Sequence, residues 1–258
     1  MELLRTERIT KTYRDHTVIR DISIHLEEKE IISLLGLSGS GKTTILNIVS
    51  GLILPDSGKV FLSGRDITGQ PGQVSYMLQK DLLLEHKRVI DNVALPLVIR
   101  GMKKEEARAK ADPLFAQFDL SGTQMLYPSQ MSGGMRQRAA LLRTYLGSRG
   151  VLLLDEPFSA LDMITREQLH EWYLDIREKI GFSTILITHD ADEAIQLSDR
   201  IYILSGSPGE IRYEFRIDVP RELRKDFRLM PEYTAYRRKI RDALRPAGES
   251  MREEGDCL

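Results

Sequence analysis

The stretch LLGLSGSGKTTILNI, residues 34–48, places three glycines and a lysine between an apolar run and an expected helix. Four of its residues, Gly36, Gly41, Lys42 and Thr43, match the spacing G-x-x-x-x-G-K-[ST]. Glycines at these positions let successive backbone N–H groups point inward, and the start of a following helix adds positive potential. The stretch therefore predicts a loop that cradles phosphate groups, in which Lys42 reaches the outer phosphates and the Thr43 hydroxyl can bind Mg²⁺.

The residues on either side of this loop place it between a buried strand and a helix. The run IISLL, residues 31–35, is continuously apolar, as in a strand buried on both faces. The segment TTILNIVSGLIL, residues 43–54, has helical character and is followed by the turn residues PDSG. This order distinguishes a phosphate loop from an accidental match and predicts phosphate contacts along the whole loop. The predicted contact residues are Gly36, Leu37, Ser38, Gly39, Ser40, Gly41, Lys42, Thr43 and Thr44.

Two adjacent carboxylates, Asp155 and Glu156, close the apolar run VLLLD at residues 151–155. A strand end beside a phosphate loop is where a carboxylate can hold Mg²⁺ through water, a role that fits Asp155. Glu156 follows directly and is placed to polarise an attacking water as a general base. Acidic residues also close strands that have no such role, but the pair in a chain with a phosphate loop favours the functional interpretation.

Composition and charge limit the classes of protein to which the chain can belong. Its 258 residues are 41% apolar, enough for one large domain or one domain with a small subdomain. The formal net charge of −1 argues against a protein built to coat nucleic acid. The single cysteine, Cys257, can form no internal disulfide, which fits a reducing compartment. No basic and apolar leader opens the sequence and no apolar run nears the ~20 residues of a spanning helix, so a soluble protein is expected.

The apolar patterns along the chain predict a mixed α/β architecture. DISIHL, residues 21–26, alternates as a half-buried strand does. The helical segment at residues 163–180 separates the buried strands VLLLD and TILIT, an order that predicts a right-handed parallel crossover. From about 80 to 150 the spacing is helical, although Pro113 should kink or restart the helix in which it lies. The residues expected to share one face of that helix are Ala107, Ala111, Leu114, Phe115 and Phe118.

The end of the chain predicts an appended segment. From Pro220 onward the sequence is rich in both charge signs, and Pro231 marks a helix start. That helix is expected to be amphipathic and to be followed by a disordered end. The predicted organisation is therefore one domain over residues 1–219, with a helical subdomain inserted at about 80–150, and a charged extension over residues 220–258. The residues expected on the apolar face of the extension's helix are Tyr236, Ile240, Ala243 and Leu244.

The stretch MSGGMRQRAALLRTYL, residues 131–146, predicts a second anion site. Ser132 is a good N-terminal cap, and Gly133 and Gly134 leave the first N–H groups of the helix uncovered. A phosphate loop alone does not need such a helix. With it, the chain resembles the ATP-binding cassette (ABC) family, whose signature is Leu-Ser-Gly-Gly-Gln, with Met131 and Met135 here replacing Leu and Gln. The form SGGMRQR is similar to the nitrate, sulfonate and taurine importer branch of that family.

The resemblance extends to about residue 217 and implies roles for further residues. Tyr13 matches the aromatic residue that stacks on adenine, and Gln79 matches the glutamine that contacts the metal and the attacking water. SALD, ending at Asp162, matches the loop that crosses the interface of a dimer and adds Asp162 to the nucleotide contacts. His189 matches the switch histidine that contacts the γ-phosphate.

The resemblance also implies a fold and a chemistry. The fold is a P-loop NTPase core of ABC type, an α/β structure with an antiparallel β-subdomain and an inserted α-helical subdomain. The implied activity is ATP hydrolysis, with ATP lying between the phosphate loop of one copy and Ser132, Gly133 and Gly134 of a second. The residues implied to act in catalysis are Lys42, Gln79, Glu156 and His189, and those implied to hold Mg²⁺ are Thr43, Gln79 and Asp155.

The implied setting is a bacterial importer for a small solute. As its ATPase subunit, the chain would lie as a peripheral homodimer on the cytoplasmic face of the inner membrane. Its partners would be integral-membrane permease subunits and, indirectly, a periplasmic or lipid-anchored solute-binding protein, with no nucleic acid. The segment DLLLEHKRVIDNV, residues 81–93, lacks the Pro-Trp that is common in the sulfonate branch, so the cargo stays open.

Two alternatives differ in what the ATPase would drive. A soluble ABC ATPase of DNA repair inserts a long coiled coil or zinc modules between phosphate loop and signature, and ribosome-acting types carry two cassettes. Between Thr43 and Ser132 this chain has no heptads and no cysteines, and it shows one cassette. The ATPase of an exporter would differ only in its membrane partner.

Overall fold

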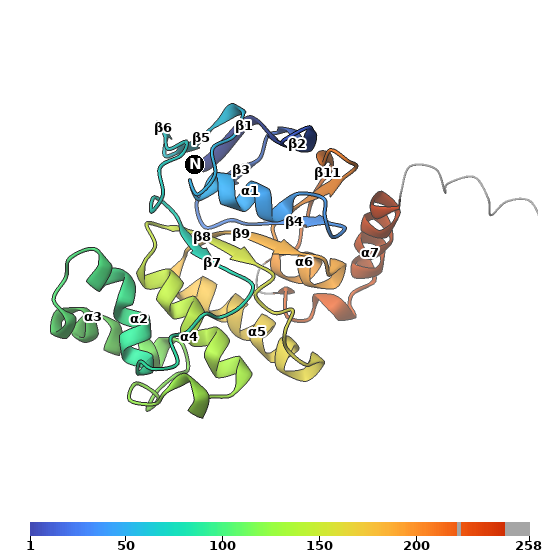
Figure 1. Cartoon of the computed structure of the whole chain (residues 1–258). Helices are drawn as coiled ribbons and strands as arrows, with labels where there is room; N and C mark the ends of the chain where they lie inside the picture. The colour runs from blue at the N-terminus through green and yellow to red at the C-terminus, as the bar shows by residue number, and fades with distance from the viewer. Residues whose placement is uncertain (221–222, 246–258) are drawn as a thin grey trace, which may run out of the picture.

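Two β-sheets form the centre of the molecule (Figure 1), and the computed structural model describes residues 1–220 and 223–245. The first sheet is antiparallel and has the order β2-β1-β5-β6, with β3 as a third partner of β1. Its strands are β1 (Glu2–Tyr13), β2 (His16–Ile22), β3 (His25–Glu27), β5 (Ser57–Leu62) and β6 (Arg65–Asp66).

The second sheet has six strands in the order β11-β10-β4-β9-β8-β7, and all neighbours are parallel except β10 and β11. Parallel strands end at the same edge of a sheet, so the residues that follow β4, β7, β8 and β9 lie near one another. The strands are β4 (Ile31–Gly36), β7 (Ser75–Met77), β8 (Val151–Asp155), β9 (Ser183–Thr188), β10 (Arg200–Ser205) and β11 (Glu210–Arg216).

Helices cover both faces of the second sheet. Leu153 on one face packs with Leu46 of α1 and with the first sheet, whereas Leu152 and Leu154 on the other face pack with α4 and α5. Helices α1 and α4 therefore belong to opposite faces, as Figure 1 shows. The helices are α1 (Lys42–Val49), α2 (Val89–Ile99), α3 (Lys104–Gln117), α4 (Gly133–Leu146), α5 (Met163–Ile180), α6 (Ala191–Leu197) and α7 (Pro231–Leu244), with 3₁₀ turns η1 (Pro128–Gln130) and η3 (Phe227–Leu229).

The helix after the phosphate loop is shorter than predicted. It ends at Val49 instead of residue 54, because Gly51 leaves the helical conformation with a φ of +77°. A Cβ atom at Gly51 would lie 2.6 Å from the backbone carbonyl carbon of Gln70, so only glycine fits there. The prediction of a helix over 43–54 is wrong at its C-terminal end.

Two other local predictions need correction. Residues 21–26 are not one strand, because β2 ends at Ile22 and β3 begins at His25. The Thr6 hydroxyl bridges the gap by accepting from the Ile24 amide and donating to the Ile22 carbonyl, so β1 keeps partners along its length. Helix α3 does not restart at Pro113, which lies inside one continuous helix.

The segment after residue 220 packs onto the rest of the chain. Helix α7 begins at Pro231, where the sequence predicts a start, and its Tyr233 and Ile240 are buried in one apolar cluster with Ile195 of α6 and Ile203 of β10. The boundary at 219/220 and the helical subdomain at about 80–150 stay predictions. The predicted disordered end falls on residues 246–258, outside the described residues. No helix in the described part of the chain has the length and apolar character to cross a membrane.

Candidate nucleotide-binding site

The loop between β4 and α1 needs glycine for two different reasons. A Cβ at Gly36 would lie 2.4 Å from the Leu204 carbonyl oxygen, and one at Gly41 would lie 2.3 Å from Ile19 Cγ2. Gly39, with a φ of +83°, instead faces open space. Gly41 is also the N-cap of α1 and provides no side-chain acceptor, so the first N–H groups of α1 stay available to an anion.

Lys42 lies folded into this loop. Its side chain is buried, and Nζ donates to the carbonyl oxygens of Gly36 at 2.8 Å and Leu37 at 2.9 Å. Burial lowers the pKa of the ammonium group, and the nearby Glu156 and Asp155 oppose that shift. An ammonium group has three N–H donors, so one remains to contact a phosphate oxygen.

Asp155 is held at the end of β8 by two hydroxyl groups. Thr43 Oγ1 and the Tyr76 hydroxyl each donate to Asp155 Oδ2 at 3.2 Å. Burial raises the pKa of Asp155, against the lowering effect of these two hydrogen bonds. Thr43 and Asp155, predicted as metal ligands, are thus neighbours. Sequence reasoning missed Tyr76, which the pairing of β7 with β8 brings to this carboxylate.

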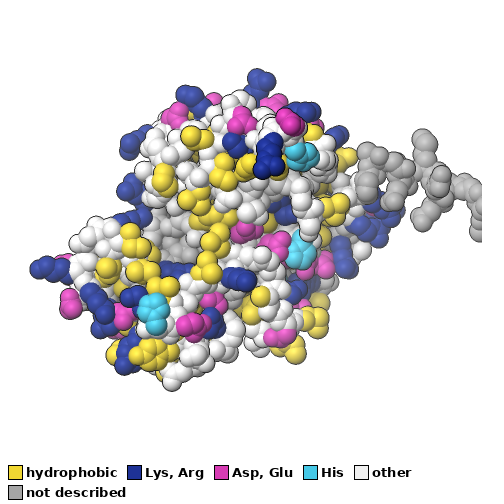
Figure 2. Space-filling model, in the orientation of Figure 1, with side chains coloured by type: hydrophobic (Ala, Val, Ile, Leu, Met, Phe, Trp, Pro, Cys, Tyr) yellow, Lys and Arg dark blue, Asp and Glu magenta, His cyan; other side chains and the backbone are white. Residues whose placement is uncertain are grey.

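Glu156 is the point at which three predicted catalytic side chains meet. Gln79 Nε2 donates to Glu156 Oε2 at 3.3 Å, and His189 Nδ1 lies 3.2 Å from the same oxygen. These residues follow β7, β8 and β9, which are neighbours in the sheet. Figure 2 shows acidic and histidine side chains near the centre of the side of the molecule that it presents. Glu156 itself has a φ of +46°, and its amide donates to the Ile187 carbonyl oxygen at 3.0 Å.

Ser132 caps α4 as predicted, since its Oγ accepts from the Met135 amide at 3.3 Å. Gly133 and Gly134 have a packing role that sequence reasoning missed. Their Cβ atoms would lie 3.3 Å from Leu161 Cδ2 and 3.2 Å from Thr165 Cγ2, so the glycines also let α4 approach the start of α5. Helices α1 and α4 pack on opposite faces of the sheet, and among the described residues no hydrogen bond joins Ser132 to the phosphate loop.

The remaining two predicted nucleotide contacts have local partners. Tyr13 ends β1 with 43% of its side chain exposed, and Lys11 Nζ lies 5.6 Å from the centre of its ring. Asp162 caps α5, where its Oδ1 accepts from the Thr165 amide at 3.0 Å. Hydrogen bonding to Thr165 lowers the pKa of Asp162.

Asp81 joins the segment after Gln79 to helix α4, a link that sequence reasoning missed. Arg136 Nε and Nη2 donate to the two carboxylate oxygens of Asp81 at 2.9 and 3.1 Å, a bidentate geometry. Arg143 of the same helix donates to the carbonyl oxygen of Leu82 at 2.8 Å. The segment that carries Gln79 is therefore fixed to the helix that Ser132 caps.

Comparison with known proteins gives the family. The family model described as ABC transporter matches residues 19–159. The chain is 38% identical to the formylaminopyrimidine import ATP-binding protein ThiZ of Halalkalibacterium halodurans over 95% of both chains. The chain belongs to the ABC transporter family. It is also 37% identical to the sulfate/thiosulfate import ATP-binding protein CysA of Synechococcus elongatus, over 81% of this chain and 63% of that one.

Solved structures support the fold of this ABC protein. A dimeric ABC transporter cassette, MJ0796, is 27% identical, with a TM-score of 0.72 over 84% of this chain and all of that one. The cassette MJ1267, at 22% identity and a TM-score of 0.75, is similar in fold over 92% of this chain. The predicted P-loop NTPase fold of ABC type is thus confirmed, and the chain is an ATP-binding ATPase.

Proposed function

We propose that the chain is the ATP-hydrolysing subunit of a bacterial ABC importer for a small solute. The observation that supports this role most directly is the meeting of Gln79 and His189 at Glu156 Oε2. A carboxylate held by an amide and an imidazole, beside a phosphate loop, is arranged to orient and deprotonate water. The printed names of ThiZ and CysA as import proteins favour import over export.

The side chains divide the work in this proposal. Lys42 donates its free N–H to a phosphate oxygen and stabilises the charge that develops during phosphoryl transfer. Glu156 takes the proton from water, and Gln79 and His189 fix its carboxylate. Gln79 also contacts the metal and the attacking water, and His189 contacts the γ-phosphate. Tyr13 stacks on adenine, and the backbone N–H groups of the phosphate loop hold the phosphates.

Thr43 and Asp155 fit a bound Mg²⁺, with Gln79 as a third ligand, because one hydroxyl and one buried carboxylate already lie together there. Within the described residues, no three acidic, histidine or cysteine side chains group as metal ligands. A magnesium ion that keeps waters and binds phosphate oxygens does not need such a group. When bound, the ion would neutralise charge on the phosphates.

The proposed working form is a head-to-tail homodimer. The phosphate loop and the helix capped by Ser132 pack on opposite faces of one sheet, so a second copy is needed to bring them to the same ATP. Asp162 would lie in the segment that crosses between the copies, next to Met163 and Ile164, whose side chains are 71% and 65% exposed. The similar cassette MJ0796 is a dimer.

The proposed partners are integral-membrane permease subunits, with a solute-binding protein acting indirectly and the ATPase on the cytoplasmic face of the inner membrane. The proposed cargo is nitrate, a sulfonate, taurine or a related solute, supported by the form SGGMRQR. The printed cargoes of the relatives, formylaminopyrimidine and sulfate or thiosulfate, are other small solutes.

The test combines hydrolysis with partner capture. Purified protein should hydrolyse ATP only with Mg²⁺, and Lys42→Ala should abolish turnover while the circular dichroism spectrum stays the same. Expressed in its own host with an affinity tag, the chain should co-purify with membrane permease subunits. Near-normal turnover in Lys42→Ala would contradict the role of the loop, and co-purification with ribosomes or DNA instead of a permease would contradict the importer.

A further inference from the structure

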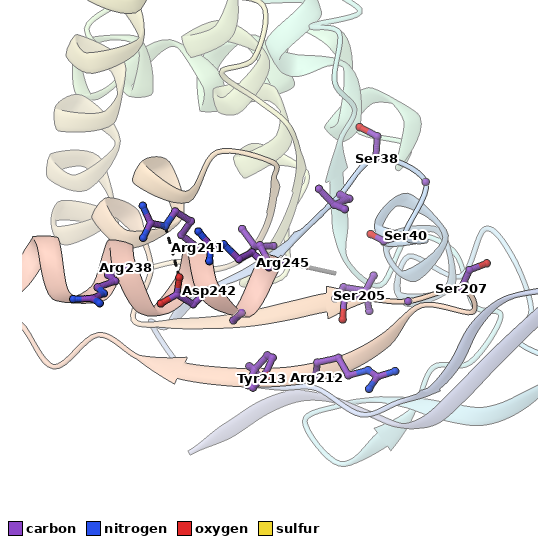
Figure 3. Close-up of a pocket in the computed structure, with 16 residues that line it drawn as sticks. Ser38, Ser40, Ser205, Ser207, Arg212, Tyr213, Arg238, Arg241, Asp242 and Arg245 are labelled. Atoms are coloured by element: carbon purple, nitrogen blue, oxygen red, sulfur yellow. Dashed lines mark ion pairs between the residues drawn. The ribbon is translucent and has the colours of Figure 1, made fainter. Parts of the chain in front are cut away.

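A cavity of about 960 Å³ lies beside the phosphate loop, outside the residues that meet at Asp155 and Glu156. Figure 3 shows its walls: the C-terminal half of α7 on one side, β11 below, and the phosphate loop opposite α7. The end of β10 and the turn that follows it close the remaining side. The cavity shares Leu37, Ser38, Gly39 and Ser40 with the phosphate loop, but Lys42, Asp155 and Glu156 of the proposed hydrolytic centre do not line it.

The cavity has an excess of positive charge. Among the lining residues that the structure describes, Asp242 is the one carboxylate, and it lies 3.7 Å from Arg241. Arg212 lies 3.8 Å from Glu210, which is outside that lining. Arg238 and Arg245 form no ion pair with any other residue that the structure describes, and Figure 2 shows Lys and Arg side chains gathered over α7. The guanidinium groups that line the cavity belong to Arg212, Arg238, Arg241 and Arg245.

Hydroxyl groups complement these guanidinium groups. Ser205 and Ser207 border the cavity from the end of β10 and the turn after it, and Ser38 borders it from the phosphate loop. Ser40, also in the lining, is 93% buried, and its Oγ has no hydrogen-bond partner within the described residues. A buried hydroxyl without a partner is costly, and a polar ligand in the cavity would supply one.

The cavity is also joined to the phosphate loop through backbone contact. A Cβ atom at Gly209, in the turn between β10 and β11, would lie 2.1 Å from the carbonyl oxygen of Ser40. The glycine therefore lets the turn and the loop touch directly. A ligand held by the turn and α7 would rest against the outer side of the same loop that cradles phosphate.

We infer that this cavity is a second anion site, which binds a small phosphate-bearing molecule between α7 and the outer side of the phosphate loop. Guanidinium groups suit phosphate because their N–H donors match its oxygens in a bidentate geometry. The volume is that of a pocket for a small metabolite, and the half-exposed ring of Tyr213 provides an apolar wall. A phospholipid headgroup has the same chemistry.

The test uses pyrophosphate as the probe and the full chain saturated with ADP and Mg²⁺, so that the phosphate loop is already filled. Isothermal titration calorimetry should show saturable pyrophosphate binding. The double variant Arg238→Gln/Arg245→Gln should weaken it roughly 10-fold or more, because two charge-assisted hydrogen bonds are lost. Lys239→Gln is the matched control, since it removes a positive charge from α7 at a residue outside the lining, and it should bind like wild type.

Sedimentation with phosphatidylglycerol vesicles distinguishes the two sources of phosphate. Vesicle binding that the double variant loses would assign the site to a lipid headgroup, and pyrophosphate binding without vesicle binding would assign it to a free metabolite. The inference is overturned if neither probe binds, or if the double variant and Lys239→Gln bind alike. These binding measurements do not depend on ATP turnover. A failure of the second anion site would therefore leave the proposed ATP hydrolysis unaffected.

Discussion

Glu156 has a backbone conformation that few side chains adopt. Its φ of +46° lies in the left-handed region, where a residue other than glycine costs roughly 1–2 kcal/mol. Three hydrogen bonds hold that conformation. The Glu156 amide donates to the Ile187 carbonyl oxygen, and the Ser159 amide and hydroxyl both donate to the Glu156 carbonyl oxygen. Such strain is found at functional sites, where a side chain must be aimed in one direction. Here it turns the carboxylate towards Gln79 and His189.

Substitutions of the two adjacent carboxylates, Asp155 and Glu156, should have different effects. Glu156→Gln keeps the size of the side chain and removes the base, so turnover should fall by ~10²-fold or more. Binding of MgATP should survive, and the ATP-bound dimer should become long-lived. Asp155→Asn should instead weaken Mg²⁺-dependent nucleotide binding itself. Steady-state ATPase assays and nucleotide titrations measure both effects.

Asp155→Asn is thus the internal control, because both substitutions remove one negative charge at the same strand end. Turnover of Glu156→Gln at the wild-type rate would show that another group is the base. Equal loss of MgATP affinity in both variants would show that the two carboxylates share one role.

His170 of α5 and Glu193 of α6 are polar residues buried where these two helices pack together. The His170 Nε2 and Glu193 Oε2 atoms lie 3.8 Å apart and both side chains are buried. Burial lowers the pKa of His170 to about 4 and raises the pKa of Glu193 to about 8, with Asp190 adding to the latter. At neutral pH both groups are therefore uncharged, and the contact is not an ion pair.

A pH dependence of stability follows from these shifts. Folded Glu193 holds a proton that the unfolded chain has lost. Its contribution to the free energy of unfolding is therefore full below about pH 4.5 and falls as the pH rises to about 8. His170 has the opposite effect between about pH 4 and 6.5, which offsets the fall in that range. Wild type should therefore lose stability from about pH 6.5 to 8, measured by urea unfolding. The free energy of unfolding of Glu193→Gln should change less with pH over this range. An equal change in both proteins would show that Glu193 does not cause it.

Elements with strong local signals could be predicted from the sequence, and elements set by distant contacts could not. Helix α5 has the bounds that the sequence predicts, and the structure shows two local signals there. Asp162 caps its start, and Gly181, with a φ of +74°, ends it. The gap between β2 and β3 depends on the hydrogen bonds of Thr6, which no local pattern reveals. The earlier end of α1 follows from Gly51, a local signal that the prediction of a helix over 43–54 overlooks.

The same distinction holds at the candidate site. The motifs indicate Gln79, Glu156 and His189 as catalytic residues, but their meeting at one oxygen depends on strand order across the sheet. Tyr76 was missed because an aromatic residue in a short strand is ordinarily a core residue. Only the pairing with β8 brings its hydroxyl to Asp155.

Across the whole molecule, the segment after residue 220 shares a core with the sheet. Phe227 is fully buried and its ring centre lies 5.4 Å from that of Tyr233 and 5.9 Å from that of Tyr236. Arg224, also buried, donates to the backbone carbonyl oxygens of Ser198 and Ile217. These contacts connect the segment to the residue that ends α6 and to the residue that follows β11.

Phe227→Ala should therefore lower the global free energy of unfolding by about 3–5 kcal/mol, the usual cost of removing a buried ring. Leu229→Ala is the matched control two residues away, because its side chain is 85% exposed and the change should stay within about 0.5 kcal/mol. Urea titration followed by fluorescence measures both. An unchanged midpoint for Phe227→Ala would instead support an independent extension beyond residue 219.

Formation of the proposed dimer depends on Ser132. Ser132→Arg should block the second copy's contact with ATP while leaving nucleotide binding by the single chain intact. Tested in the Glu156→Gln background by size-exclusion chromatography with ATP and Mg²⁺, it should abolish the dimer. Ser132→Gly separates this effect from loss of the cap, since glycine costs only a few tenths of a kcal/mol at that position. Dimers that persist in Ser132→Arg would contradict the head-to-tail arrangement.

The bidentate bond between Asp81 and Arg136 has a consequence for transport stoichiometry. This bond joins the segment after Gln79 to the helix capped by Ser132. A displacement of that segment would therefore move Gln79, at the chain's own ATP, and Ser132, at the ATP of the second copy, at the same time. Without the bond, hydrolysis could proceed while the two sides move out of step. In the proposed importer, assembled with its permease, Asp81→Asn should thus leave the rate of ATP hydrolysis near normal and lower the number of solute molecules moved per ATP. Slippage of this kind would be seen only when flux and phosphate release are measured together.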